Sequence, residues 1–176
     1  MRTTLRVLSQ AIVIILCVLF AFPAQAQQPD PTLPPLSEHA ILTLHAIGSQ
    51  IYSCQPSGSR NQYQWTFLAP AARLFNAAGN EVATHGDGPT WNYQDSSSIQ
   101  GIVRAKSPSP DRASIPWLLL KATNPQRNGI LTTVDYIRRS DTQGGTAPAT
   151  GCDAEHQGAL ARIPYTATYT FYSAKP

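Results

Sequence analysis

From Ala40 onward, the chain consists of short runs rich in β-branched and aromatic residues, interrupted roughly every dozen positions by Gly, Pro, Asn or Asp. Such runs, bounded by turn-forming residues, are typical of β-strands. Beyond the N-terminal apolar segment, no stretch repeats its apolar residues every 3.6 positions over ten or more residues; 70–78 is Ala-rich but short. About eight to nine strands at this spacing predict an all-β fold, an antiparallel β-sandwich or barrel.

The apolar pattern within these runs indicates how each strand is buried. Gly48 separates the first two and predicts a bulge or bend. The run 115–120 is apolar on both faces, which is typical of a central strand, and 163–172 places Tyr165 and every second residue up to Phe171 on one face. Asn76–Asn80 predicts a hairpin turn. The expected strands are 41–47, 50–54, 63–68, 73–75, 81–85, 99–106, 115–123, 130–138 and 163–172.

The first 26 residues have the three parts of a secretory signal peptide. Arg2 and Arg6 precede an apolar run, 11–22, and Ala24-Gln25-Ala26 supplies the small residues of a cleavage site. That run is too short to cross a bilayer core of about 30 Å. We expect export by the Sec pathway, cleavage before Gln27, a Pro-rich leader at 27–39 that acts as a spacer, and one β domain at 40–174.

The charge balance excludes several classes of protein. Charged residues make up 13% of the chain, against a usual share of about 25%. Without Arg2 and Arg6, 11 basic residues remain beside 10 acidic ones, a net charge of +1. A polybasic nucleic-acid binder or a coiled coil needs far more charge, and no second apolar stretch is long enough to span a membrane.

Two cysteines remain after signal cleavage, Cys54 and Cys152. An even pair in an exported protein favours a disulfide. No C-x-x-C motif and no zinc-type Cys/His spacing points to a redox or metal-binding thiol.

Several motifs in fixed order carry a resemblance to a known family. They are Gly48-Ser49-Gln50-Ile51-Tyr52-Ser53-Cys54, His85-Gly86-Asp87-Gly88-Pro89-Thr90-Trp91, Ile115-Pro116-Trp117-Leu118-Leu119-Leu120, Tyr136-Ile137-Arg138, Thr142-Gln143-Gly144-Gly145-Thr146-Ala147-Pro148, Gly151-Cys152-Asp153 and Pro164-Tyr165-Thr166-Ala167-Thr168-Tyr169. Over about 40–174, the chain resembles a secreted domain family of unknown function from bacteria and filamentous fungi that includes fungal appressorium-associated proteins. At the position where members of that family have a sequence resembling Asp-Gly-Ser, this chain has Asp95-Ser96-Ser97.

The resemblance implies no established activity, substrate or cofactor. Some members carry a malate dehydrogenase label, but this chain has no G-x-G-x-x-G after a strand and no alternation of strands and helices. A dinucleotide site of the Rossmann type needs both, so the sequence predicts neither that activity nor a bound cofactor.

The segment 85–93 is the strongest candidate for a ligand site. Two Gly and a Pro are expected to shape a loop from which His85, Asp87, Trp91 and Tyr93 project, with Asp95 close by. Aromatic rings beside hydrogen-bonding groups suit a glycan or a small ligand. The alternative is a rigid turn whose Trp packs in the core.

Other chemistry stays open on the same residues. His85, Asp87 and Asp95 are one conceivable metal-binding set, Asp153, Glu155 and His156 another, but neither has the spacing of a known site. Asp87 and Asp95 are also a possible acid and base pair. Arg138-Arg139 beside Asp141 suggests an ion pair at a strand end.

These observations favour an exported, disulfide-bonded β domain that binds a glycan or small ligand without catalysis. The alternatives are a hydrolase or metal-dependent enzyme acting on an envelope or wall polymer, and a purely structural protein.

Overall fold

The computed structural model describes residues 29–58 and 62–175. The predicted signal peptide and its cleavage site lie outside these residues. Within the described part, no helix is long and apolar enough to cross a membrane. The elements are β1 (Glu38–Pro56), β2 (Tyr63–Phe75), β3 (Glu81–Gly86), β4 (Thr90–Tyr93), β5 (Ser98–Ser107), β6 (Trp117–Gln126), the 3-10 helix η1 (Ile130–Thr133), β7 (Tyr136–Gly144) and β8 (Leu160–Ala174).

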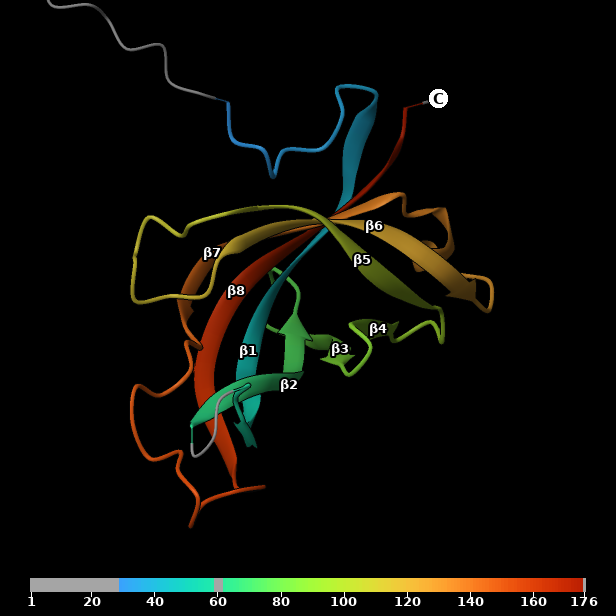
Figure 1. The fold of residues 1–176 in the computed structure, drawn as a ribbon. Coiled ribbons are helices and arrows are strands. Elements are labelled where there is room, and N and C mark those ends of the chain that lie inside the picture. Colours follow the sequence, from blue (N-terminus) through green and yellow to red (C-terminus); the bar gives the residue numbers. More distant parts are fainter. Residues whose placement is uncertain (1–28, 59–61, 176) are drawn as a thin grey trace, which may run out of the picture.

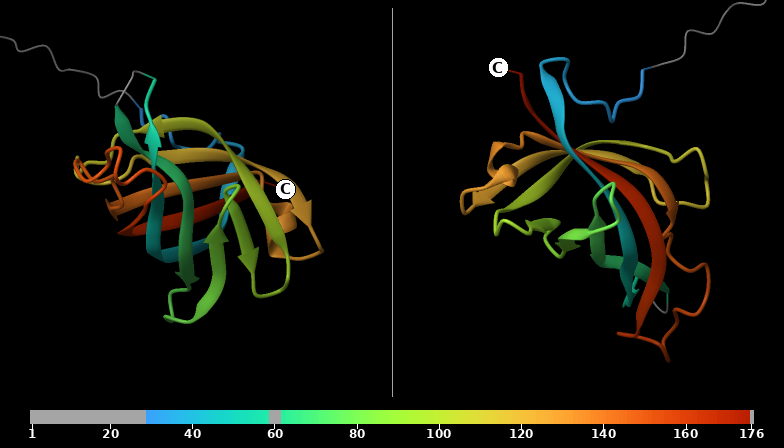
Figure 2. Two further views of the ribbon diagram at one scale, coloured as in Figure 1. Left: turned by 60° about the horizontal axis from the view of Figure 1, so that its bottom comes forward. Right: turned by 180° about the vertical axis from the view of Figure 1, so that it is seen from behind.

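The eight strands form one closed antiparallel barrel (Figure 1). Each strand pairs with its neighbours in chain order, and β8 pairs with β1 along most of both strands, which closes the sheet. The prediction of an antiparallel all-β fold is confirmed, and the barrel is the architecture that forms. Closure leaves no open sheet edge. Figure 2 shows the strands wrapping around a common interior.

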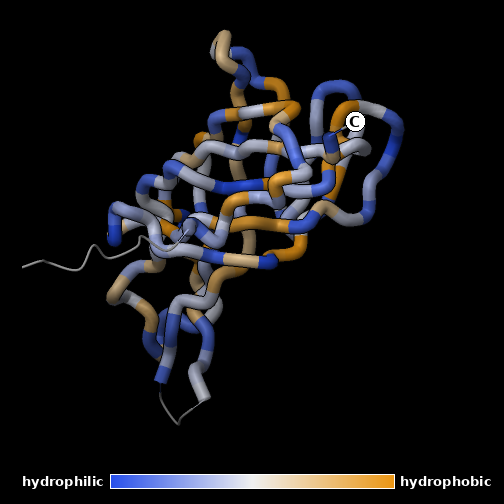
Figure 3. Tube along the Cα trace, turned by 90° about the horizontal axis from the view of Figure 1, so that it is seen from above, coloured by the Kyte–Doolittle hydropathy of each residue, from blue (hydrophilic) through white to orange (hydrophobic). Residues whose placement is uncertain are grey.

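Because successive strands run in opposite directions, alternate connections lie at the same end of the barrel. The connections after β1, β3, β5 and β7 form one end, which we call the mouth. Those after β2, β4 and β6 form the other end, which we call the base. At the base, η1 places Leu131 in the core. Figure 3 shows largely hydrophilic peripheral connections and hydrophobic stretches within the strands.

The structure differs from the expected strand boundaries in four places. The runs on either side of Gly48 form one strand, β1, and its register is continuous there. A Cβ at Gly48 would collide with the carbonyl oxygen of Ala71, so the glycine permits a close approach of β2 rather than a bulge. The strand β2 continues through the Ala-rich stretch to Phe75. Residues 130–138 divide into η1 and the start of β7, and 90–93 form a strand, β4, that was expected to be loop.

The predicted disulfide is confirmed. Cys54, near the end of β1, is bonded to Cys152, with 5.3 Å between the Cα atoms and a sequence separation of 98. The bond attaches the long β7–β8 connection to the barrel wall. Trp65 of β2 holds the same connection, because its Nε1–H donates to the carbonyl oxygen of Thr150.

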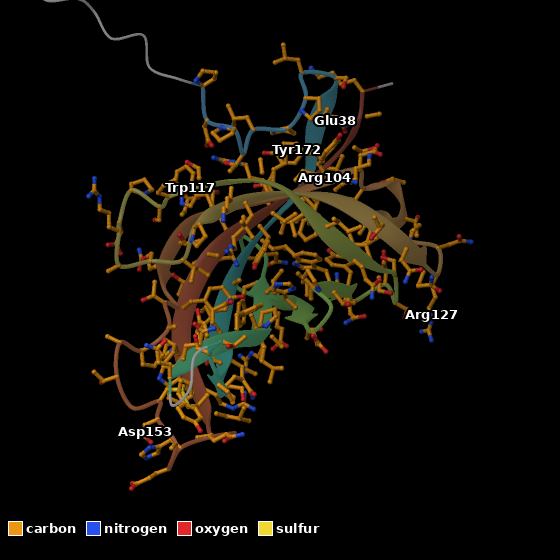
Figure 4. The ribbon with its side chains drawn as sticks, in the orientation of Figure 1. Glu38, Arg104, Trp117, Arg127, Asp153 and Tyr172 are labelled. Atoms are coloured by element: carbon orange, nitrogen blue, oxygen red, sulfur yellow. A yellow bond between two sulfur atoms is a disulfide. The ribbon has the colours of Figure 1, made fainter. Side chains whose placement is uncertain are left out.

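The described part of the Pro-rich leader, from Pro29 to Ser37, is attached to the barrel and is not a free spacer. Asp30 accepts a hydrogen bond from Arg138 Nη2 at 2.7 Å, and the hydroxyl of Thr32 lies between them, donating to Asp30 and accepting from Arg138 Nε. The Arg138 guanidinium also lies over the ring of Trp117, which Figure 4 places beside the leader. Arg138 therefore pairs with Asp30, not with Asp141 as expected.

Candidate functional site

The β3–β4 hairpin places two of the predicted site residues inside the barrel. His85 and Trp91 are register partners, and their rings stack with centroids 4.2 Å apart. Tyr169 of β8 meets both rings edge-on. Trp91 is only 1% exposed and belongs to the hydrophobic core. The rings therefore do not project from a loop, and Trp91 packs in the core, which is the alternative that the sequence left open. The Asp87-Gly88 pair, with Gly88 at φ 76°, is a hairpin signal in the sequence.

The other predicted site residues lie in different surroundings. Asp87 is exposed in the β3–β4 turn, where its Oδ1 accepts the N–H of Gly88. Tyr93 packs partly buried against the core. Asp95 lies in the β4–β5 turn at the base, where its carboxylate accepts hydrogen bonds from the Ser97 N–H and hydroxyl and from the Ile130 N–H. The chain therefore brings His85, Asp87 and Trp91 to one cavity and leaves Tyr93 and Asp95 outside it.

That cavity is a space of about 210 Å³ in the mouth half of the barrel, and all eight strands contribute residues to its wall. Around it lie the apolar side chains Phe67, Leu68 and Val103, each about half exposed. The remaining lining residues are Gln50, Pro70, His85, Asp87, Gly88, Pro89, Trp91, Leu118, Leu120, Arg139 and Tyr169.

The interior beside this cavity is rich in hydrogen-bond donors without acceptors. Gln50 Nε2, Trp91 Nε1 and the hydroxyls of Tyr165 and Tyr169 are buried and form no hydrogen bond of good geometry among the described residues, although the two hydroxyls lie near each other, with Gln50 near Tyr165 and Arg139 near Tyr169. Buried polar groups are nearly always paired, so a cluster of unpaired donors beside a cavity is a feature of a ligand site or of a site that holds ordered water.

Arg139 adds a positive charge to the same wall. It follows buried Ile137 by two positions on β7, so it shares the inward face, and it is 9% exposed. Its Nε and Nη2 donate to the carbonyl oxygen of Pro116 at 3.2 and 2.9 Å. No carboxylate among the described residues forms a salt bridge with it.

The other titratable groups of the interior are neutral near pH 7. Burial lowers the pKa of His85 to about 4, and the nearby charge of Arg139 acts in the same direction. The neutral ring lies with Nδ1 3.0 Å from the Thr90 carbonyl oxygen, so Nδ1–H donates there. Burial raises the pKa of the Tyr165 and Tyr169 hydroxyls, which therefore remain donors. Arg139 supplies the buried charge of the cavity wall, and Asp87 an exposed one.

Gln50, Arg139 and Tyr169 line the cavity but are not among the site residues predicted from the sequence. Arg139 was interpreted as part of a strand-end ion pair, although the period of two that makes Ile137 inward also makes Arg139 inward. The inward face of β8 was predicted from Tyr165 to Phe171 and is confirmed, but an aromatic on that face could equally have been core.

The candidate metal ligands do not form a cluster in the described part of the chain, where no three His, Cys, Asp or Glu side chains come together. Asp153 Oδ1 instead accepts the N–H groups of Glu155 and His156 and lies 2.7 Å from His156 Nδ1, in an exposed turn.

Comparison with known proteins places the chain in a family. Residues 35–173 match the family described as "Protein of unknown function (DUF3455)". The chain belongs to the DUF3455 family. No curated protein and no solved structure matches it significantly. The DUF3455 match spans all eight strands, so the barrel and its cavity are the part of the chain that the family defines.

Proposed function

We propose that this DUF3455 domain binds a small, largely apolar molecule inside the barrel, without catalysis. The observation that carries the proposal is the donor-rich cavity bordered by half-exposed Phe67, Leu68 and Val103. Eight-stranded barrels have interiors wide enough either to be filled by side chains or to hold one small ligand. Here side chains fill the base half, and the mouth half contains the cavity.

The size of the cavity limits the ligand. An engineered apolar cavity of about 150 Å³ binds benzene, whereas drug-sized ligands occupy sites of roughly 300–1,000 Å³. A space of about 210 Å³ therefore suits one ring with short substituents or a short chain. The cavity suits a glycan less well, because the two aromatic rings expected to stack on a sugar are not available: Trp91 is buried and Tyr93 lies outside the cavity.

The geometry gives less support to the hydrolase alternative. It needs His85, Asp87 and Asp95 to reach one substrate, and Asp95 is engaged at the base with Ser97 and Ile130. We further propose that binding takes place outside the cytoplasm, because the Cys54–Cys152 disulfide suits an oxidising compartment and the N-terminal sequence has the pattern of a Sec signal.

A thermal-shift panel on the secreted protein tests the proposal. The probes are indole, benzyl alcohol, hexanol and soluble wall glycans. Binding at about 100 times the dissociation constant stabilises a protein by roughly 2.7 kcal/mol, which raises Tm by several degrees at this size. We expect single-ring and short-chain probes to raise Tm and glycans to leave it unchanged.

Two neighbouring substitutions on β5 locate the site. Val103→Trp should narrow the cavity entrance and weaken binding at least tenfold. Ile102→Trp should leave binding unchanged, because Ile102 is similarly exposed but does not line the cavity. Equal affinities for the two variants, or no Tm response to any apolar probe, would contradict binding inside the barrel.

A further inference from the structure

The wall of the cavity contains a charge that an apolar ligand alone would not satisfy. Arg139 is about nine-tenths buried, lines the cavity and forms no salt bridge with a described carboxylate. A buried ionised group without a counter-charge is strongly unfavourable. The carboxylate of Asp87 also lines the cavity, but it is exposed and binds the Gly88 N–H.

The guanidinium has donors to spare. Of its five N–H groups, Nε and one on Nη2 bind the Pro116 carbonyl oxygen. Three N–H groups remain, two on Nη1 and one on Nη2. Together these two nitrogens can donate two parallel hydrogen bonds to the oxygens of one carboxylate.

The unpaired groups around Arg139 are also donors. Gln50 and Tyr169 line the same cavity, and neither Gln50 Nε2 nor the Tyr169 hydroxyl forms a hydrogen bond of good geometry within residues 29–58 and 62–175. Both can donate to an oxygen anion. The occupant that this wall matches best therefore carries acceptor oxygens with a negative charge.

Resting on the proposed function, we propose that the ligand is a small carboxylic acid, bound with its carboxylate at Arg139 and its ring or short chain toward Phe67, Leu68 and Val103. The acid group then supplies the counter-charge to Arg139 and accepts from Gln50 and Tyr169. The apolar end fits the border of the cavity, where exposed hydrophobic side chains gather.

The experiment compares each acid with its own uncharged amide by calorimetric titration of the secreted protein at pH 7. The pairs are phenylacetate with phenylacetamide and hexanoate with hexanamide, which differ little in shape but differ in charge. We expect each acid to bind at least tenfold more tightly than its amide. Arg139→Gln should remove that preference by weakening the acid, and Arg104→Gln, the loss of an exposed charge on β5, should preserve it.

Arg139 also ties β7 to Pro116, so its loss lowers stability whether or not a ligand binds. The readout is therefore the ratio of acid to amide affinity, which a purely structural role would not change. If Arg139→Gln does not fold, the acid–amide comparison on the parent protein and on Arg139→Lys, which keeps the charge, still decides the question.

The outcomes separate the two proposals. Equal binding of acids and amides, tighter binding of amides, or an acid preference that survives in Arg139→Gln would overturn the carboxylate assignment and leave apolar binding intact. Failure of both members of every pair to bind would overturn the proposed function as well.

Discussion

His85 makes the stability of the barrel depend on pH. Its pKa is about 4 in the folded protein and about 6.5 in an unfolded chain. Between these values the unfolded chain takes up a proton that the folded state does not, so stability falls as the pH drops from about 6.5 to 4. The total loss is about 3 kcal/mol. The aspartates with lowered pKa values act mainly below this window.

The test is urea unfolding at several pH values for the parent and His85→Phe. The phenyl ring keeps the stack on Trp91 and cannot take up a proton. Between pH 6.5 and 4, we expect the free energy of unfolding to fall much less in His85→Phe than in the parent. His45→Gln, a change at an exposed position of β1, is the control. Parallel profiles for the parent and His85→Phe would show that the folded state does not exclude the proton.

Ser96 occupies a backbone conformation that favours glycine. Ser96 lies in the β4–β5 turn with φ 71°. It stands at the position where the resembled family has the glycine of its Asp-Gly-Ser pattern. The left-handed conformation costs a residue with a side chain roughly 1–2 kcal/mol, partly offset by the greater freedom of glycine in the unfolded chain. We predict that Ser96→Gly raises the free energy of unfolding by about 0.5–1 kcal/mol, measured in urea. A destabilised Ser96→Gly protein would contradict the turn geometry.

Trp91 shows why a truncation cannot test its role in binding. It stacks on His85 and meets Tyr169 and Phe171 edge-on within the core. Removal of a buried aromatic side chain costs about 3–5 kcal/mol, so Trp91→Ala is expected to destabilise or unfold the domain whatever it binds. The milder Trp91→Phe removes the indole N–H and keeps much of the packing.

At the scale of elements, the Cys54–Cys152 disulfide links β1 to the β7–β8 connection across 98 positions. The lower entropy of the cross-linked unfolded chain corresponds to a stabilisation of roughly 4–5 kcal/mol for a closed loop of about this length, whereas a disulfide typically stabilises a protein by about 2–4 kcal/mol. We predict that the double variant Cys54→Ala/Cys152→Ala loses 2–4 kcal/mol of unfolding free energy. The chemically reduced parent protein should match it. A loss below about 1 kcal/mol would mean that the loop is held mainly by contacts such as Trp65 to Thr150.

The leader depends on Asp30. Burial opposes its ionisation, but the hydrogen bonds from Thr32 and the pairing with Arg138 hold the pKa of its carboxyl below the usual range. We predict that Asp30→Asn speeds amide hydrogen exchange in 30–37 and changes global stability by less than about 1 kcal/mol. Asp141→Asn, at the residue expected from sequence to pair with the arginines, should leave exchange in the leader unchanged. Unaltered exchange in Asp30→Asn would mean that the leader is held by other contacts.

Local sequence signals predicted the elements well where a single strand or turn carries its own information. The Asn76–Asn80 turn and the inward face of β8 are examples, since turn residues and a period of two are local properties. Gly48 and β4 were misjudged for different reasons. Gly48 is required by the close approach of the β2 backbone, which lies far away in sequence. The strand β4 has four residues, too few for alternating buried and exposed side chains to form a recognisable pattern.

At the scale of the whole molecule, barrel closure and the cavity could not be predicted from the sequence. Closure depends on the register between β1 and β8, which lie at opposite ends of the domain. The cavity is the space in the mouth half that side chains from all eight strands leave unfilled, and no local sequence pattern predicts such a space. For the same reason Asp95 looked close to His85 in sequence but lies at the base.

Occupancy of the cavity is the central claim, and methyl NMR tests it most directly. Phenylacetate and, in a separate titration, phenylacetamide are added to the purified protein labelled at Leu and Val methyl groups. We predict saturable shifts at Val103, Leu118 and Leu120, which line the cavity, with none at the exposed Leu36 and Leu160. Absence of shifts at the three cavity residues with both phenylacetate and phenylacetamide, or shifts confined to the outer surface, would contradict a ligand site inside the barrel.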